Sequence, residues 1–287
     1  MQIFLAKTAG FCFGVDRAVS LVEQTIARGE KAVTLGPIIH NRHVVDRFNR
    51  LGVREIASPA EAAQEETVIL RAHGVPQAVQ AELAARGLRV VDATCPFVKK
   101  IHHIVQRAEA QGRRCIIIGS PEHPEVTAIA SFCTAPMIVP TAEALEDALE
   151  ADKSLHCYPL TMVCQTTGTQ KNWDLCRKIA KKICTNCEIF DTICKATEMR
   201  QEEAIALSRK CDAMVVVGDA SSANTGRLAM ICKQYCQSVS LVDHAGELEP
   251  QRFSDASTIG ITAGASTPSW IIKEVNNTMS EELKVET

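Results

Sequence analysis

A weak internal repeat constrains the fold of this chain more than any other feature. Two stretches, around Cys95 and Cys194, share the order strand, Asp, two residues, Cys, helix; a third, around Cys12, has the strand and helix without the Asp. A glycine at the end of an apolar run lies 24 residues beyond each cysteine, at Gly36, Gly119 and Gly218. We therefore expect three similar units, each with one cysteine in an equivalent place.

Short β-branched runs alternate with segments of helical period along the whole chain. The runs include TVIL at 67–70, CIII at 115–118 and AMVVV at 213–217. Helical periods lie between such runs, at 97–111, 170–182, 199–210 and 225–236. Strict alternation of strand and helix predicts an α/β protein with mainly parallel sheets.

The repeat predicts three small α/β lobes, with boundaries at 13–95, 96–193, and 1–12 plus 194–287. The third lobe has a closing helix at 268–283 and then lacks a final strand. The strand at 2–6 precedes Cys12 as the strand at 88–91 precedes Cys95, so we expect it to return and complete lobe three. The expected architecture is a pseudo-threefold ring around a central site.

Each lobe carries two polar loops that directly follow strands. The loops after the repeat glycines contain PIIHNR, SPEHPEV and DASSANTG, and the second loops read AHG, QTT and GAS. Ligands of open α/β sheets bind at the carboxyl edges of the strands. We expect six loops and three cysteines to face one cavity.

The chain has 13 cysteines among 287 residues, and their chemical state depends on the cellular compartment. The start, MQIFLAKTAG, lacks the features of a signal peptide, and the apolar runs are too short to span a bilayer. We expect a cytoplasmic protein, in which structural disulfides are disfavoured. A formal charge of −3 with scattered basic residues gives no footprint for nucleic acid. The cysteines are then core residues, redox groups or metal ligands.

Cys12, Cys95 and Cys194 each lie between a strand and a helix N-terminus, where the helix dipole favours a thiolate. Three thiolates suit a soft metal or an iron–sulfur cluster with one open coordination position. The alternatives are that all three are buried small hydrophobes, or that the CxxC pair Cys184 and Cys187 is the reactive one. We interpret that pair as a helix-end pair without metal.

The polar loops supply candidate ligands for an anion. Histidines and short polar residues near helix N-termini suit a phosphate or diphosphate, although each histidine alone can equally be a structural hydrogen bonder. The candidates are His40, His73, His123, Thr166, Ser222, Asn224 and Ser266. The chain has no GxGxxG, Walker A, HExxH or GxSxG motif.

Glu125, in the segment HPEV, is the acidic candidate beside a candidate histidine at the expected cavity edge. A carboxylic acid enclosed by apolar walls and thiolate charge should have a raised pKa and donate a proton. Alternatively, it is a first-turn glutamate that complements its helix dipole.

Eight segments together carry a resemblance to a known family. They are, in order, GFCFGVDRAV, GPIIHNR, AHGVP, DATCP, HPEV, QTT, DTIC-x-AT-x-x-RQ and TAGAS, spread over about residues 10–270. They resemble the 4-hydroxy-3-methylbut-2-enyl diphosphate reductases, terminal enzymes of the non-mevalonate isoprenoid pathway.

The resemblance implies a role for each candidate residue. It implies a 4Fe–4S cluster with one open iron, held by Cys12, Cys95 and Cys194. It assigns the diphosphate to His40, His73, His123, Ser222, Asn224 and Ser266. Its catalytic group is Glu125 as proton source, Thr166 near the substrate hydroxyl, and His123.

The implied reaction is a reductive dehydroxylation at the open iron that gives isopentenyl and dimethylallyl diphosphates. The implied electron donor is a ferredoxin or flavodoxin, which delivers electrons one at a time. No nucleic acid or membrane is involved.

One departure from the family concerns the diphosphate loop, which reads Ser222-Ala223-Asn224 instead of Ser-Ser-Asn. Loss of one hydroxyl to a charged phosphate is expected to cost about 1.5–3 kcal/mol. A paralogue that reduces a different diphosphate is therefore an alternative hypothesis. A non-catalytic anion-binding protein or a redox sensor that uses Cys184 and Cys187 is another.

Overall fold

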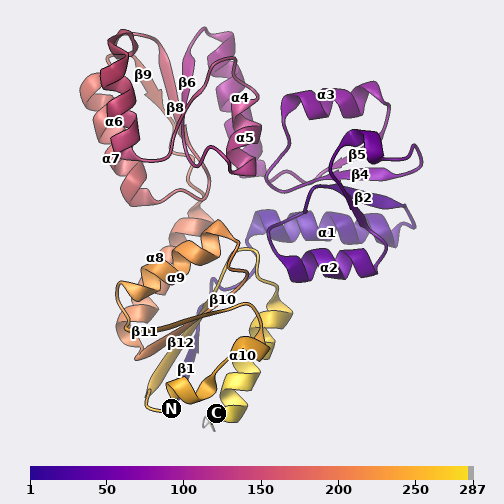
Figure 1. Cartoon of the computed structure of the whole chain (residues 1–287), viewed down its shortest axis with the longest axis vertical. Coiled ribbons are helices and arrows are strands. Elements are labelled where there is room, and N and C mark those ends of the chain that lie inside the picture. Colours follow the sequence, from indigo (N-terminus) through magenta and orange to yellow (C-terminus); the bar gives the residue numbers. More distant parts are fainter. Residues whose placement is uncertain (284–287) are drawn as a thin grey trace. The chain divides into compact units, whose positions relative to one another are not determined.

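The computed structural model describes residues 1–283, apart from the side chain of Ala223. These residues form three four-stranded sheets in which every strand pair is parallel. The α/β class and the mainly parallel sheets predicted from the sequence are confirmed (Figure 1).

The three sheets share one strand order. Sheet B runs β3 (Arg54–Ile56), β2 (Ala32–Leu35), β4 (Thr67–Leu70), β5 (Arg89–Asp92). Sheet C runs β7 (Met137–Val139), β6 (Arg114–Ile118), β8 (Leu160–Cys164), β9 (Cys187–Ile189). Sheet A, read the same way, runs β11 (Ser238–Val242), β10 (Ala213–Val217), β12 (Thr258–Ala263), β1 (Gln2–Leu5).

The N-terminal strand completes sheet A. β1 pairs in parallel with β12, with Gln2 opposite Thr258 and Leu5 opposite Ile261. The predicted return of this strand is confirmed, and β1 takes the edge position that β5 and β9 hold in the other sheets.

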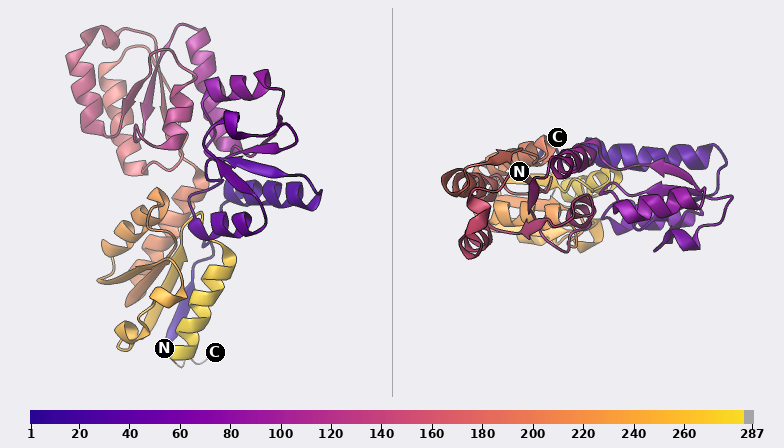
Figure 2. Two further views of the ribbon diagram at one scale, coloured as in Figure 1. Left: turned by 45° about the vertical axis from the view of Figure 1, so that its right-hand side comes forward. Right: turned by 90° about the horizontal axis from the view of Figure 1, so that it is seen from above.

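Helices cover both faces of each sheet (Figures 1 and 2). α8 and α9 lie on one face of sheet A, and α10 lies on the other. α6 and α7 lie on one face of sheet C, and α4 and α5 lie on the opposite face. Sheet B lies between α3 and α1. Their bounds are α1 Phe13–Ala27, α2 Arg42–Arg50, α3 Gln77–Ala85, α4 Pro96–Ala110, α5 Pro124–Ala130, α6 Ala142–Ala151, α7 Gln170–Ile183, α8 Lys195–Lys210, α9 Ala223–Lys233 and α10 Ser269–Glu282.

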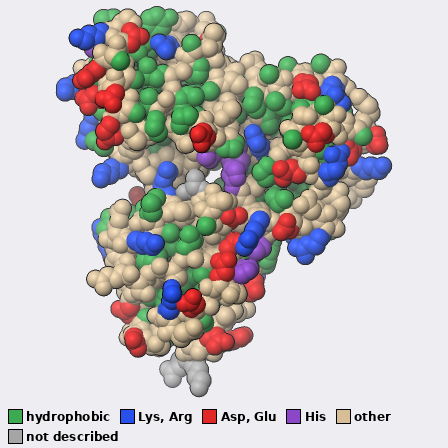
Figure 3. All heavy atoms as spheres, in the orientation of Figure 1, with side chains coloured by type: hydrophobic (Ala, Val, Ile, Leu, Met, Phe, Trp, Pro, Cys, Tyr) green, Lys and Arg blue, Asp and Glu red, His purple; other side chains and the backbone are tan. Residues whose placement is uncertain are grey.

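The inner strands carry the hydrophobic core. Every residue of β2, β4, β8 and β10 is buried, as expected for parallel strands covered on both faces. The edge strands β1, β5 and β9 are only partly buried and include polar residues such as Arg89 and Glu188. On the face in Figure 3, basic and acidic side chains are interspersed, in keeping with the formal charge of −3.

The described chain divides into two compact units. Unit 1 contains residues 1–16, 39–51 and 195–287, and therefore sheet A and α2; unit 2 contains residues 17–38 and 52–194, and therefore sheets B and C. The lobe boundaries proposed from the repeat stay a prediction. Within residues 1–283, no helix is long and apolar enough to cross a membrane.

A buried histidine makes folding of unit 2 sensitive to pH. His102 in α4 lies against Phe132, with ring centroids 4.5 Å apart, and burial lowers the pKa of its imidazole from 6.5 to about 4. The unfolded chain therefore takes up this proton first, and the free energy of unfolding should fall as pH drops from about 6.5 to about 4.

We expect His102 to contribute about 2–3 kcal/mol to this loss. Urea unfolding of wild type, His102→Gln and His103→Gln across that pH range tests the expectation. The His102→Gln curve should be flatter than the wild-type curve, and His103→Gln is the matched control because His103 is exposed on the same helix. Equal slopes in all three proteins would contradict it.

Candidate functional site

Each repeat cysteine is held by a backbone hydrogen bond to the loop after the neighbouring strand. For Cys12, Cys95 and Cys194, the N–H donates to the carbonyl of Ala265, Ala72 and Thr166, at 3.1, 2.9 and 2.9 Å respectively. A helix begins at the next residue in all three cases. The cysteines are half-buried, so each thiol combines partial access with a position next to a helix N-terminus.

The repeat glycines also make equivalent bonds. Gly36, Gly119 and Gly218 donate their N–H to the carbonyl that ends the other edge strand, of Ile56, Val139 and Val242, at 2.9, 3.0 and 2.8 Å. At Gly218, φ is +140° and an added Cβ would lie 2.4 Å from Oγ1 of Thr267. Glycine is required there because the backbone turns tightly against a neighbouring loop.

In unit 2, the Glu125 carboxylate is bonded at both oxygens to Thr166. Oε1 accepts from the Thr166 N–H and Oε2 is bonded to the Thr166 Oγ1, both at 2.6 Å. Glu125 is 2% exposed, and burial raises its pKa although the two hydrogen bonds oppose the shift. The predicted raised pKa is confirmed. Glu125 does lie in the first turn of α5, but its side chain is engaged with the loop after β8.

Two of the candidate histidines adjoin this pair. His123 is the N-cap of α5, and its Nδ1 accepts from the Glu125 N–H at 3.2 Å. The rings of His73 and His123 meet edge to face, with centroids 5.8 Å apart. Since Thr166 also binds the Cys194 N–H and Ala72 precedes His73, contacts run without a break from Cys194 to Cys95. Unit 2 thus brings together four predicted site residues and two predicted cluster ligands.

In unit 1, three of the remaining candidates follow adjacent strands of sheet A. Ser222 and Asn224 lie after β10, and Ser266 lies after β12; all three are buried. Nδ2 of Asn224 and Oγ of Ser266 have no hydrogen-bond partner among residues 1–283. A buried donor without a partner costs about 1–3 kcal/mol, so each such group calls for an explanation such as a bound ligand. Ser222 is the N-cap of α9 and makes no side-chain bond to the helix.

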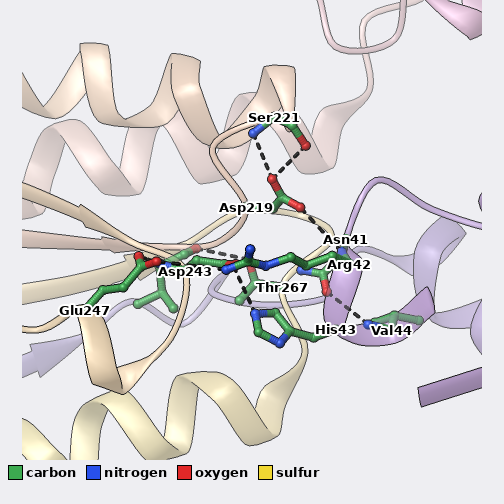
Figure 4. Close-up of polar contacts among 10 residues, drawn as sticks. Asn41, Arg42, His43, Val44, Asp219, Ser221, Asp243, Glu247 and Thr267 are labelled. Carbon is green, nitrogen blue, oxygen red and sulfur yellow. Dashed lines mark hydrogen bonds and ion pairs between the residues drawn. The ribbon is translucent and has the colours of Figure 1, made fainter. Parts of the chain in front are cut away.

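A polar network holds the loop that contains His40 beside the loop that contains Ser222 (Figure 4). The Arg42 N–H donates to Oδ2 of Asp219 at 3.4 Å, and Asp219 also accepts from the N–H and hydroxyl of Ser221. The Arg42 guanidinium lies 2.6 Å from Oδ2 of Asp243, and Nε2 of His43 lies 3.0 Å from the same oxygen. His40 directly precedes this network.

Local sequence patterns do not reveal these positioning residues. Arg42 was visible only as the last letter of GPIIHNR, and Asp243 had no motif. Arg200 and Glu203 of α8 are a similar case: Arg200 donates to the carbonyls of Thr8 and Gly10, and Glu203 accepts from the Thr8 N–H and hydroxyl. These bonds fix the loop that leads to Cys12. Arg200 stands in the segment DTIC-x-AT-x-x-RQ, but nothing in that segment indicates that it bonds to residues about 190 positions away.

The other cysteines mostly belong to the core. Seven are buried: Cys115, Cys164, Cys176, Cys184, Cys211, Cys232 and Cys236. Cys184 caps the C-terminus of α7 and Cys187 begins β9, and burial raises the pKa of both thiols. Raised pKa values disfavour the reactive thiolate, which argues against a sensor role for this pair. Among residues 1–283, no three His, Cys, Asp or Glu side chains are grouped to hold a single metal ion.

Comparison with known proteins decides the family. The family described as "LytB protein" matches residues 3–280. The chain belongs to the LytB family. The family resemblance inferred from the eight sequence segments is thereby confirmed.

LytB relatives match along nearly the whole chain. One from Geobacter sulfurreducens is 39% identical over 285 residues, which is 98% of both chains, and one from Aquifex aeolicus is 37% identical over 290 residues, which is 98% of this chain and 96% of its own. Both are named 4-hydroxy-3-methylbut-2-enyl diphosphate reductase, an oxidoreductase.

Two solved structures share the fold. A structure of (E)-4-hydroxy-3-methyl-but-2-enyl diphosphate reductase, described as the terminal enzyme of the non-mevalonate pathway, is 36% identical with a TM-score of 0.74, over 98% of this chain and 100% of its own. The Plasmodium falciparum reductase is 26% identical with a TM-score of 0.89, over 97% and 87%.

We expect the Asp243 network to stabilise unit 1. Asp243→Asn removes the charge that Arg42 and His43 share, and should lower the free energy of unfolding by about 1–2 kcal/mol. Urea unfolding measures this change. Asp255→Asn is the control, because Asp255 is exposed and the charge change is the same. If both variants lost the same stability, the network would contribute nothing.

Proposed function

We propose that this chain reduces 4-hydroxy-3-methylbut-2-enyl diphosphate to isopentenyl and dimethylallyl diphosphates, the last step of the non-mevalonate isoprenoid pathway. The names of its LytB relatives supply the substrate. The observation in this structure that supports the reaction best is the buried pair of Glu125 and Thr166. The substrate hydroxyl must leave as water, and that step needs a proton at its oxygen.

The overall reaction consumes two electrons and two protons. The allylic C–O bond breaks, its oxygen leaves as water with one proton, and the second proton forms a new C–H bond. Addition at one end or the other of the allyl system gives the two products. The chain must therefore supply a proton source, an anion site for the diphosphate and a route for electrons.

Hydrogen-bond roles indicate which oxygen of Glu125 carries the proton. The Thr166 N–H can only donate, so Oε1 must accept, and the proton of the neutral acid belongs on Oε2. Oε2 faces the Thr166 hydroxyl, which can accept that proton while it donates its own to the substrate oxygen. Burial raises the pKa of Glu125 and so favours the protonated acid over the carboxylate.

We assign the diphosphate to the residues that the family resemblance implies, which are His40, His73, His123, Ser222, Asn224 and Ser266. The buried donors of Asn224 and Ser266 support this assignment, because phosphate oxygens would give them acceptors. Ser222 and Asn224 at the start of α9 add a helix N-terminus, which favours an anion. The side chain of Ala223 lies outside the described part of the chain.

Cys12, Cys95 and Cys194 would hold a 4Fe–4S cluster. Thiol ligands fit such a cluster, and these three share equivalent backbone anchors, half-buried positions and helix N-termini. When bound, the cluster would supply electrons one at a time and an open iron for the substrate oxygen. The electrons would come from a ferredoxin or flavodoxin, and a reducing cytoplasm would suit the thiol ligands.

The proton-source role predicts the effect of Glu125→Gln. The amide keeps an acceptor for the Thr166 N–H and a donor for its hydroxyl, but it has no acidic proton. We expect kcat to fall at least about 100-fold while KM changes little. Steady-state kinetics under anaerobic conditions with a chemical reductant measure both values.

Glu122→Gln is the matched control, since Glu122 is exposed three residues earlier and the side-chain exchange is the same. It should retain wild-type kcat. A Glu125→Gln enzyme with kcat close to wild type would remove Glu125 as the proton source.

A further inference from the structure

One helix next to a proposed cluster ligand has an exposed basic face. Pro96, Lys99, Lys100, His103, Ile104 and Arg107 of α4 line a shallow hollow of about 460 Å³ that begins at the residue after Cys95. Phe97, beside Pro96, is 46% exposed. The basic face therefore adjoins an exposed aromatic ring at the N-terminus of α4, where Cys95 is the N-cap residue.

The helices after the other two cysteines differ in charge. The first 12 residues of α4 contain three Lys or Arg and no acid. The first 12 residues of α1 contain one Arg and two acids, and those of α8 contain two basic and three acidic residues. Only α4 combines a repeat cysteine with a uniformly basic start.

Helix stability does not explain this charge. Lys99 and Lys100 lie near the N-terminus of α4, where cations are disfavoured by the helix dipole. Lys99 is compensated by Asp92, with Nζ 2.6 Å from Oδ2. Lys100 is exposed and forms no ion pair among residues 1–283. Lys100 is therefore an exposed cation available to an acidic partner.

We propose that the basic face of α4, centred on Lys100, His103 and Arg107 and edged by Phe97, is the docking surface for reduced ferredoxin, a small acidic one-electron carrier. This inference rests on the proposed function, because that reaction needs electrons from outside the chain. Electron-transfer complexes are small and transient, and charge complementarity sets their association rate. A basic face with an apolar edge beside Cys95 fits that kind of partner.

The test variant reverses two charges, Lys100→Glu with Arg107→Glu, and leaves Lys99 to its ion pair with Asp92. The control variant is Lys181→Glu with Lys182→Glu, in the last turn of α7. Both lysines are exposed. They precede the amino end of β9, whereas Cys194 follows the carboxyl end of that strand. The two variants change net charge equally.

Two measurements separate docking from chemistry. Calorimetric titration with oxidised ferredoxin should show at least tenfold weaker binding for the α4 variant and less than twofold change for the α7 variant. Anaerobic turnover should give kcat/KM for reduced ferredoxin at least tenfold lower for the α4 variant, with weaker salt dependence. Turnover driven by reduced methyl viologen should stay within twofold of wild type.

Equal effects of the α4 and α7 variants on ferredoxin binding would overturn the docking surface while the proposed function stands. An equal loss of methyl viologen turnover and ferredoxin turnover in the α4 variant would also overturn it, because the defect would then lie in the reaction. A wild-type protein that binds ferredoxin but turns over no substrate with either reductant would instead refute the proposed function.

Discussion

One backbone hydrogen bond, made three times, underlies the arrangement of the candidate site. In each sheet the edge strand that precedes a cysteine ends at the carboxyl edge, and the cysteine N–H then binds the loop that follows the neighbouring strand. The bond fixes the start of a helix against a polar loop, so one thiol and one set of loop side chains share an edge. Parallel pairing makes this possible, because the carboxyl ends of parallel strands, and the loops that follow them, all lie at the same edge of the sheet.

Thr166 connects that architecture to the chemistry. Its carbonyl accepts from Cys194, its N–H donates to Glu125 and its hydroxyl pairs with the other carboxyl oxygen. The carbonyl belongs to the backbone, and no mutation of the Thr166 side chain removes it. The backbone of residue 166, rather than its side chain, therefore holds Cys194. The side chain is then available for proton transfer. Unit 1 has a comparable arrangement. Asp219 and Arg42 hold the loop after β10, which leads to Asn224, and the buried Nδ2 of Asn224 has no hydrogen-bond partner within the described residues.

Local patterns sufficed to predict inner strands of the sheets but not the hydrogen-bond network around the site. The runs at 67–70 and 213–217 match β4 and β10 residue for residue, because buried parallel strands are continuously apolar. The short edge strands β3 and β7 carry little such signal and were not identified. The Glu125 and Thr166 pair could be expected from motifs, whereas the bonds of Arg200 to the loop before Cys12 join residues about 190 positions apart and have no local signature.

The central claim is that Cys12, Cys95 and Cys194 hold a catalytic iron–sulfur cluster. Anaerobic reconstitution followed by iron and sulfide analysis and spectroscopy, with and without 4-hydroxy-3-methylbut-2-enyl diphosphate, tests it most directly. We expect about four iron and four sulfide per chain, a spectrum that changes when the substrate is added, and loss of the cluster on Ser substitution of any of the three cysteines but not of the exposed Cys157. A full cluster in all three variants, or a spectrum indifferent to the substrate, would contradict the claim.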